Sequence, residues 1–299
     1  MFKKISNKIQ FLKFLKRSRT NSKIIKRIVK KKICIIDIGA GHRYLSSLLN
    51  FDGSAEIHMI DPHKSLLWSS ENLKKIIENK EDVKTYQVGI GAQTMKKVMY
   101  MGTRPTASTF LNIFKLSKGK KYELDMKYFS KNKQLVNIFS FKDFLKKFNI
   151  KSPSIIKIDV EGMEDIVLDS ILKSCRPFLL QIEVNVNSEL YNNTFNKINA
   201  QLIKLNYELK TFYPTYLNKK NNYCIKGNYD YPEIRSSIGQ LDCIYVLKKR
   251  NTNLQEVAIL MGFGFSMEAI KKIQQIKKVT PKLKEEINFY FKNLSNEMS

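Results

Sequence analysis

Residues 33–41 read Ile-Cys-Ile-Ile-Asp-Ile-Gly-Ala-Gly, an apolar run that ends in an acid and a glycine-rich turn. The run is rich in isoleucine, which favours a buried β-strand. Glycines after a strand let the backbone turn sharply and approach a ligand closely. Because ligands of open α/β sheets bind outside the carboxyl ends of the strands, we interpret Asp37, Gly39 and Gly41 as part of a binding site.

After this stretch the sequence alternates between predicted strands and predicted helices. Further strands are predicted at residues 55–60, 83–90, 154–160 and 178–186. Helices are predicted at residues 44–49, 66–77 and 163–172, and again before residue 205. Such alternation is typical of βαβ units, so the predicted fold class is α/β with a parallel sheet covered on both faces. The last two strands, 207–213 and 241–247, have no clear helix between them and are predicted to pair antiparallel.

We divide the chain into three parts. Residues 1–32 contain no Asp or Glu, and apolar residues recur at helical spacing from Phe2 to Leu15, which predicts a basic amphipathic helix. Residues 33–250 hold the alternating pattern, and residues 251–299 are predicted to form a helical C-terminal extension. Two interpretations of the basic helix stay open: packing on the domain, or peripheral contact with an anionic membrane such as the inner membrane face.

The composition excludes several classes of protein. Hydrophobic residues make up 43% of the 299, which is globular usage and excludes a fully disordered chain. No apolar run approaches the ~20 residues of a membrane-spanning helix, so we do not expect an integral membrane protein. The four cysteines lie far apart without a CxxC pair, which favours a reducing, cytoplasmic location.

The chain is strongly basic. Its formal net charge is +26, from 53 Lys and Arg against 27 Asp and Glu. Such a field attracts polyanions, including nucleic acid, acidic glycans and anionic lipids. Outside the N-terminal segment the lysines are scattered, however, which favours a diffuse basic surface over a nucleic-acid partner.

The glycine-rich turn lacks the signatures of two common nucleotide sites. The dinucleotide fingerprint needs a small residue where this chain has Tyr44, and no GK[ST] follows to make a P-loop. A nucleoside without a pyrophosphate therefore fits better. Asp61 follows the second strand, 24 positions after Asp37, where a carboxylate can accept both ribose hydroxyls. The alternative role of Asp61 is to cap the next helix.

Residues 156–164 read Ile-Lys-Ile-Asp-Val-Glu-Gly-Met-Glu and resemble the hallmark of the FkbM-type S-adenosylmethionine-dependent methyltransferases. Residues 36–41 resemble the first motif of that family, and residues 59–62 resemble its second-strand acid followed by proline. The resemblance covers roughly residues 33–250. It implies a Rossmann-like class I methyltransferase sheet of seven strands with a reversed last strand.

The same resemblance implies the activity and the cofactor. It implies O-methylation of a hydroxyl on a sugar, glycan or other small molecule, with S-adenosylmethionine as the methyl donor. Asp37, Gly39, Gly41 and Asp61 are then the expected cofactor-binding residues. Relatives often have a histidine after the Glu-Val of the fifth strand, where this chain has Asn185, so any contribution of that histidine would be missing here.

Asp159 and Glu161 are the candidate catalytic residues, because they lie at the carboxyl end of the fourth strand, beside the expected methyl group. An alcohol is a poor nucleophile, so a carboxylate that accepts its proton assists the reaction. We assign Asp159 as base or acceptor orienter and Glu161 as a cofactor-side or structural contact. The alternative for Glu161 is an acid at a helix N-terminus. No metal is predicted from the ligand spacing, although Asp159, Glu161 and Glu183 could together hold a divalent cation.

Two competing functions remain. An RNA methyltransferase would account for the basic charge and predicts a localised Lys and Arg surface with exposed aromatic residues beside the site. A catalytically silent nucleoside-binding protein would instead dock on anionic membranes through residues 1–32.

Overall fold

The computed structural model describes most of the chain. The described residues are 18–41, 46–77, 79–102, 108, 110, 129–160, 162–186, 195–218, 224–226, 235–249, 253–276, 279–285 and 287–288. The predicted apolar stripe from Phe2 to Leu15, the candidate residue Glu161 and most of the segment 103–128 lie outside the described residues.

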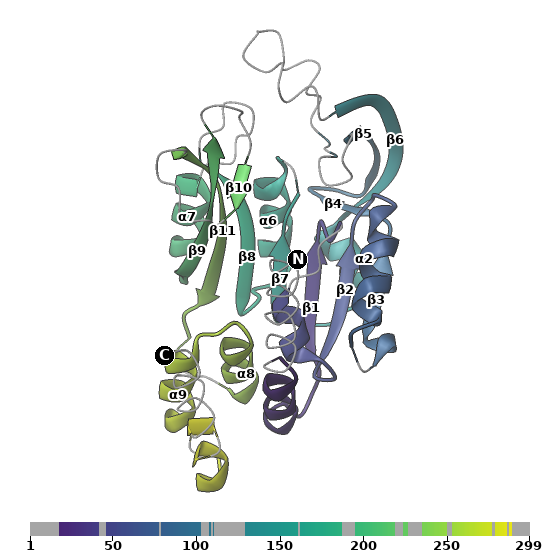
Figure 1. The fold of residues 1–299 in the computed structure, drawn as a ribbon. Helices are drawn as coiled ribbons and strands as arrows, with labels where there is room; N and C mark the ends of the chain where they lie inside the picture. Colours follow the sequence, from purple (N-terminus) through teal and green to yellow (C-terminus); the bar gives the residue numbers. More distant parts are fainter. Residues whose placement is uncertain are drawn as a thin grey trace, which may run out of the picture.

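The central sheet has eight strands in the order β10-β9-β11-β8-β7-β1-β2-β3 (Figure 1). Their bounds are β1 Ile33–Ile38, β2 Ala55–Ile60, β3 Val83–Tyr86, β7 Ile155–Ile158, β8 Leu179–Asn185, β9 Tyr207–Asn218, β10 Cys224–Lys226 and β11 Arg235–Leu247. Strands β1, β2, β3, β7 and β8 pair in parallel, whereas β11 runs antiparallel to both β8 and β9. Apart from the short β10, which pairs with β9 at the edge, this is the predicted seven-stranded sheet with a reversed last strand.

Both faces of the sheet are covered, because successive residues of a strand point to opposite faces and both sets are apolar. On β1, Ile33 and Ile35 belong to a first apolar cluster, and Ile36 and Ile38 belong to a second cluster on the other face. The first cluster is covered by residues 18–28, η1 (Ser46–Phe51), α2 (Ser65–Lys74), α8 (Leu254–Gly262) and α9 (Ser266–Gln275). The second is covered by α5 (Phe141–Lys147), α6 (Glu164–Leu172) and α7 (Phe195–Lys204).

The prediction of one strand over residues 83–90 is wrong, because the chain leaves the central sheet after Tyr86. Strand β3 ends there, and β4 (Gly89–Gly91) joins β5 (Met95–Gly102) and β6 (Phe129–Ser140) in a second sheet of order β4-β6-β5. Glycine allows the close approach of β4 to β6, since a Cβ on Gly89 or Gly91 would lie 2.7 or 2.8 Å from the Ile138 side chain. The second sheet lies above β2 and β3 in Figure 1.

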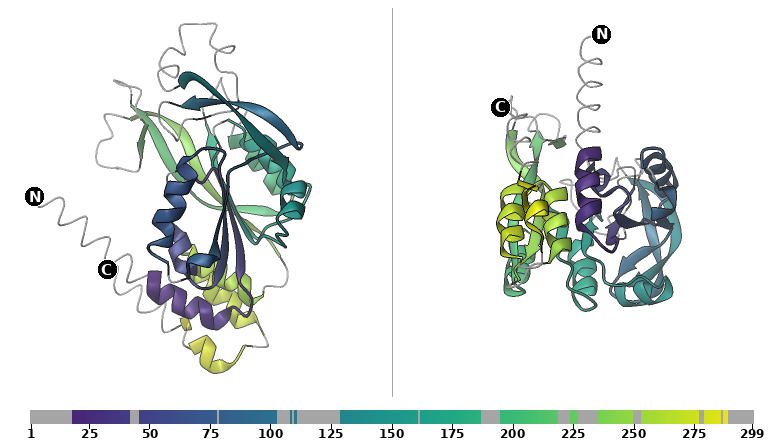
Figure 2. Two further views of the ribbon diagram at one scale, coloured as in Figure 1. Left: turned by 90° about the vertical axis from the view of Figure 1, so that its right-hand side faces the viewer. Right: turned by 90° about the horizontal axis from the view of Figure 1, so that it is seen from below.

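Residues 18–28 form a helix that packs beside the C-terminal helices (Figure 2). Its Ile25 and Ile28 are buried in the same cluster as Val257 of α8 and Ile273 of α9. This described part of the basic segment therefore packs on the domain, and the division at residues 32 and 250 stays a prediction. Within the described part of the chain, no helix is both long enough and apolar enough to cross a bilayer.

Candidate functional site

The turn after β1 is hydrogen-bonded to the ends of both neighbouring strands. The N–H groups of Gly39 and Ala40 donate to the carbonyl of Ile60 at the end of β2, at 2.8 and 3.2 Å. On the other side, the N–H of Asp159 donates to the carbonyl of Ile38 at 3.0 Å. Gly39 has a φ of +80°, and a Cβ there would lie 1.8 Å from the carbonyl oxygen of Asp159. Only glycine therefore lets the turn and the end of β7 pack this closely.

Asp61 links the end of β2 to the same turn. Its Oδ2 accepts the N–H of Gly41 at 2.8 Å, and its Oδ1 accepts the N–H of His63 at 2.7 Å. Burial raises the pKa of Asp61 to about 6, although these two N–H groups act to lower it. The negative charges of Asp37 and Asp159 raise the pKa of Asp61 further. Because such charges act on one another over short distances, the three acids belong to one site.

A buried lysine joins two of these acids. Lys157 lies opposite Asp37 in the register of β7 against β1, and its Nζ is 3.4 Å from Asp37 Oδ1. The same Nζ donates to Asp159 Oδ2 at 2.8 Å. The side chains are 9% exposed for Lys157, 1% for Asp37 and 35% for Asp159, so the cluster opens to solvent at Asp159. Among the described residues, neither oxygen of Asp37 has a hydrogen-bond partner.

The charges in this cluster shift the pKa values of their neighbours. Burial raises the pKa of Asp37, the charge of Lys157 lowers it, and the charge of Asp159 raises it again. Burial acts to lower the pKa of Lys157, yet the carboxylates of Asp159 and Asp37 raise it well above its ordinary value. Lys157 is therefore a permanent cation between two acids, and the cluster carries an excess negative charge when both acids are ionised.

The face of the sheet that carries the first apolar cluster becomes polar toward the carboxyl edge. Since every second residue of a strand shares a face, buried Ile155 on β7 is followed there by Lys157 and Asp159. On the neighbouring strands Lys157 pairs in register with Gln181, and Glu183 pairs with Asp242. The resulting polar band consists of Asp37, Lys157, Asp159, Gln181, Glu183 and Asp242.

Five of the six predicted site residues lie at this one edge. They come from the ends of β1, β2 and β7 and from the turn between them: Asp37, Gly39, Gly41, Asp61 and Asp159. The sixth, Glu161, lies outside the described residues, and its assignment stays a prediction. In the part of the chain that is described, no three His, Cys, Asp or Glu side chains are grouped as a metal ion would require.

The sequence interpretation assigned no role to Lys157. A signal for it was present, because a charged residue stands between Ile156 and Ile158 in an otherwise apolar strand. The buried ring of His58 on β2 makes a structural contact, since its Nδ1 lies 2.9 Å from the Tyr86 hydroxyl. Burial lowers the pKa of His58 to about 4, so its ring is neutral.

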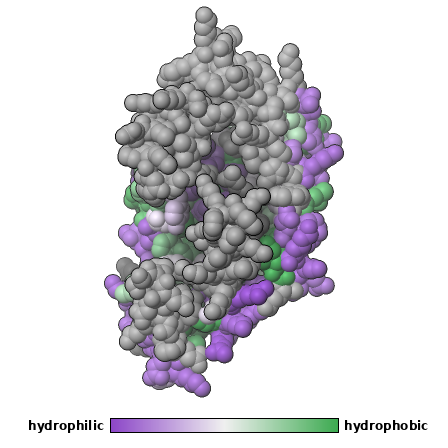
Figure 3. Space-filling view, in the orientation of Figure 1, coloured by the Kyte–Doolittle hydropathy of each residue, from purple (hydrophilic) through white to green (hydrophobic). Residues whose placement is uncertain are grey.

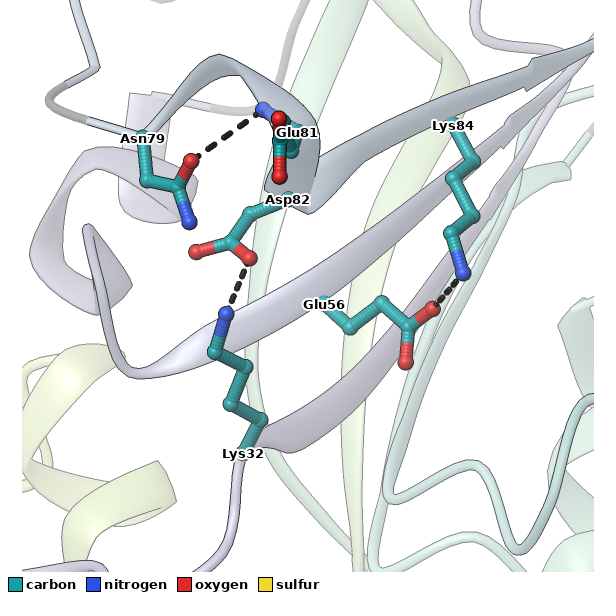
Figure 4. A pocket seen from close by; sticks show the side chains of 6 residues that line it. All are labelled: Lys32, Glu56, Asn79, Glu81, Asp82 and Lys84. Carbon is teal, nitrogen blue, oxygen red and sulfur yellow. Dashed lines mark hydrogen bonds and ion pairs between the residues drawn. The ribbon is translucent and has the colours of Figure 1, made fainter.

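Hydrophilic residues make up most of the described surface on the side of α2 and β3 (Figure 3). A second polar feature, a depression, lies at the end of the strands opposite the glycine turn. At the amino ends of β1, β2 and β3 there is a depression of about 460 Å³ (Figure 4). Lys32 pairs there with Asp82, and Lys84 pairs with Glu56. Because its charges largely compensate one another, and because it lies away from the glycine turn, this depression is not the candidate site.

The sequence also matches a known family. The profile described as "Methyltransferase FkbM domain" matches residues 37–209, which is more than half of the chain. The match runs from Asp37 into β9 and therefore includes all five residues of the carboxyl edge.

Several solved structures match the chain, although each of those named here has a TM-score below 0.5. The methyltransferase FkbM from Methylobacillus flagellatus KT is 15% identical with a TM-score of 0.39, and the match covers 72% of this chain and 43% of that one. The chain thus spans less than half the length of that protein. An S-adenosylmethionine-dependent O-methyltransferase from Thermotoga maritima is 11% identical with a TM-score of 0.34, covering 78% and 67% of the two chains. An rRNA methylase from Streptococcus thermophilus is 9% identical with a TM-score of 0.37, covering 77% and 96%. Among curated proteins there is no significant match.

Proposed function

Because the chain belongs to the FkbM methyltransferase family, we propose that it transfers the methyl group of S-adenosylmethionine to a hydroxyl oxygen of a sugar, a glycan or another small molecule. The observation that supports this most directly is the meeting of three acids and a glycine turn at one sheet edge. Asp61 is bonded to the turn that follows β1, and Asp37 and Asp159 lie close enough to influence its charge.

The residues at this edge fit the cofactor. Asp61 presents a carboxylate at the end of β2, where it can accept hydrogen bonds from ribose hydroxyls. Gly41 has a φ of +41°, which suits glycine and keeps the turn free of a side chain. Both oxygens of Asp37 are buried and retain hydrogen-bonding capacity among the described residues. We therefore assign Asp61 to the ribose, and Asp37 with the glycine turn to the remainder of the cofactor.

When bound, S-adenosylmethionine supplies a methyl group on a positively charged sulfur. Methyl transfer is a direct displacement, so the protein has to hold the acceptor oxygen in line with the methyl carbon and the sulfur. We assign this role to Asp159, because it is partly exposed at the end of β7 and accepts a hydrogen bond from Lys157. Its carboxylate would accept the hydrogen bond of the acceptor hydroxyl and would take the proton that this hydroxyl loses on methylation.

The polar band supports a hydroxyl-rich acceptor. Beside Asp159, Glu183 and Asp242 pair across β8 and β11 on the same face of the sheet. Ionised carboxylates only accept hydrogen bonds, and hydroxyl groups supply the matching donors. A sugar presents several such hydroxyls on one face, so its recognition would use these acids together.

The test is to follow a labelled methyl group. The full chain is incubated with methyl-labelled S-adenosylmethionine and with separate extract fractions of small molecules, glycans and RNA, with the Asp159→Asn protein as the control. We expect label in a methyl ether of the small-molecule or glycan fraction and little with the control. Label that nuclease releases from RNA would support the RNA methyltransferase instead. Cofactor binding without any labelled product would support the silent binding protein.

A further inference from the structure

We propose that Lys157 is a positioning residue of this site, whose buried ammonium group keeps the carboxylates of Asp37 and Asp159 ionised together at the carboxyl edge of the sheet. Its meaning for catalysis rests on the proposed function, which assigns Asp37 to the cofactor and Asp159 to the acceptor. The charge state is a property of the protein alone and can be measured without the cofactor.

Lys157 reaches both acids from the strand that lies next to β1. It stands opposite Asp37 in the strand register and precedes Asp159 by two residues, so all three side chains share one face. Its Nζ lies 2.8 Å from Asp159 Oδ2 and 3.4 Å from Asp37 Oδ1. The ammonium group is thus within contact distance of both carboxylates at once.

Packing alone does not explain a lysine at this position. On the same face of β7, Ile155 is fully buried, and an apolar side chain at position 157 would continue that pattern. Burying an ammonium group costs several kcal/mol unless a partner compensates its charge. One carboxylate would complete a neutral ion pair, yet Lys157 holds two, and the second lies at the partly exposed edge. A single buried ammonium group therefore compensates the charges of two carboxylates.

Loss of the ammonium group would leave two acids facing each other. One oxygen of each carboxylate contacts the same Nζ, so these two oxygens lie close to each other. Two carboxylates this close resist being ionised together when no cation compensates them. Burial holds the pKa of Asp37 above its ordinary value even though the charge of Lys157 acts to lower it, so loss of that charge would raise the pKa further. Without Lys157, one acid of the pair would hold a proton at neutral pH.

Two other acids face this cluster from neighbouring strands and have to be separated from it in a titration. Asp61, at the end of β2, has a pKa raised by burial to about 6 and responds to Asp37 and Asp159. Glu183, on β8, adds to the negative charge that stabilises the Lys157 ammonium. Spectra recorded at slightly alkaline pH, where Asp61 is ionised, isolate the pair of Asp37 and Asp159.

The experiment compares the full chain with three variants. Lys157→Met removes the charge with little change in side-chain length, Lys157→Arg keeps the charge, and Asp37→Asn with Lys157→Met removes the cation together with one acid. Infrared spectra report protonated carboxyl groups, and calorimetric titration with S-adenosylmethionine gives the Kd at several pH values. Unfolding in urea shows which variants fold.

We expect the infrared spectrum of Lys157→Met to show a protonated carboxyl group. The natural protein, Lys157→Arg and the double variant should lack it. The affinity of Lys157→Met for S-adenosylmethionine should rise with pH above the pKa of Asp61, by up to about tenfold per pH unit, while that of the natural protein stays constant there. If Lys157→Met has no protonated carboxyl group and the pH dependence of the natural protein, the proposal is overturned.

The proposal stays testable if Lys157→Met does not fold. In the natural protein at slightly alkaline pH, we expect Asp37→Asn and Asp159→Asn each to leave the number of protonated carboxyl groups unchanged. A protonated group that either substitution removes would overturn the proposal. If the natural protein fails to bind S-adenosylmethionine at all, the proposed function is wrong, whereas the infrared result still decides the role of Lys157.

Discussion

Asp61, the acid that ends β2, accepts the backbone N–H of Gly41 in the turn that ends β1. Two motifs that stand twenty residues apart in the sequence are therefore one structural unit. The hydroxyl of Ser69 on α2 donates to the carbonyl of Gly41, so the helix after β2 also fixes this turn. The carboxylate of Asp61 thus shapes the turn and, on the proposed function, also holds the cofactor.

Asp61→Ala should weaken binding of S-adenosylmethionine by about 100-fold or more. The ribose would lose a charged acceptor, and charge-assisted hydrogen bonds contribute about 1.5–3 kcal/mol each. Calorimetric titration measures the loss. Asp169→Ala is the matched control, because Asp169 is an exposed acid on α6 that bonds to Gln201 and lies outside the proposed site. Equal affinity in the Asp61 and Asp169 variants would contradict the assignment.

Cofactor affinity should depend on the protonation of Asp61, whose pKa is raised by burial from 3.8 to about 6. As pH falls below about 6, the folded protein protonates Asp61 and loses the charge that accepts the ribose hydroxyls. We expect the affinity to fall by up to about tenfold per pH unit in that range. Titrations of Asp61→Asn at the same pH values are the comparison, and their affinity should be weaker but nearly constant.

The free energy of unfolding should also depend on the protonation of Asp61, but it should fall with rising pH where the cofactor affinity rises. Between pH 3.8 and about 6 the folded protein retains a proton on Asp61 that the unfolded chain has released. The free energy of unfolding therefore falls as pH rises through this window, by about 2–4 kcal/mol in total. Urea unfolding of the natural protein and of Asp61→Asn should show the difference as two curves that diverge with pH. Parallel curves would mean that Asp61 has an ordinary pKa.

Asp159→Asn should keep cofactor binding and lose methyl transfer. The amide is nearly isosteric with the carboxylate but cannot take the proton of the acceptor hydroxyl, and general-base assistance contributes about 10²–10⁴-fold. Transfer of labelled methyl to the accepting fraction, measured beside the calorimetric Kd, separates the two effects. A variant that transfers methyl at the natural rate would remove Asp159 from the base role.

Much of the central sheet could be predicted because its parallel strands are mostly apolar. Residues such as Ile33 to Ile38 are buried on both faces, and such runs stand out from the polar segments beside them. The glycine turn and Asp61 could be placed together for the same reason, since parallel strands end at one edge. Each of these features lies within a short stretch of sequence, so the residue types of that stretch are enough to predict it.

The features that escaped prediction depend on contacts between distant segments. Strand β5 contains Lys96 and Lys97, and β6 contains Lys131 and Lys133, so charged residues take up part of both strands. The break between β3 and β4 depends on the approach of Gly89 to Ile138, almost fifty residues later. Lys157 has a similar origin, because its partner Asp37 is supplied by a strand 120 residues earlier in the sequence.

The closeness of the glycine turn to β7 yields a stability prediction with an internal control. Gly39 and Gly264 both have positive φ values, +80° and +84°. A Cβ on Gly264 would meet no atom within 4 Å, so Gly264→Ala measures the cost of the backbone conformation alone, about 1–2 kcal/mol. A Cβ on Gly39 would lie 1.8 Å from the carbonyl oxygen of Asp159 and would force the turn and β7 apart.

Gly39→Ala should therefore lower the free energy of unfolding by the amount measured for Gly264→Ala and by about 1–3 kcal/mol more for the overpacked contact. Urea unfolding of the two variants measures both losses under the same conditions. Displacement of Asp159 would also separate the proposed base from the cofactor turn, so methyl transfer should fall in Gly39→Ala and persist in Gly264→Ala. Equal destabilisation in the two variants would show that β7 can yield at Asp159, and the close approach of turn and strand would then not be a requirement of the site.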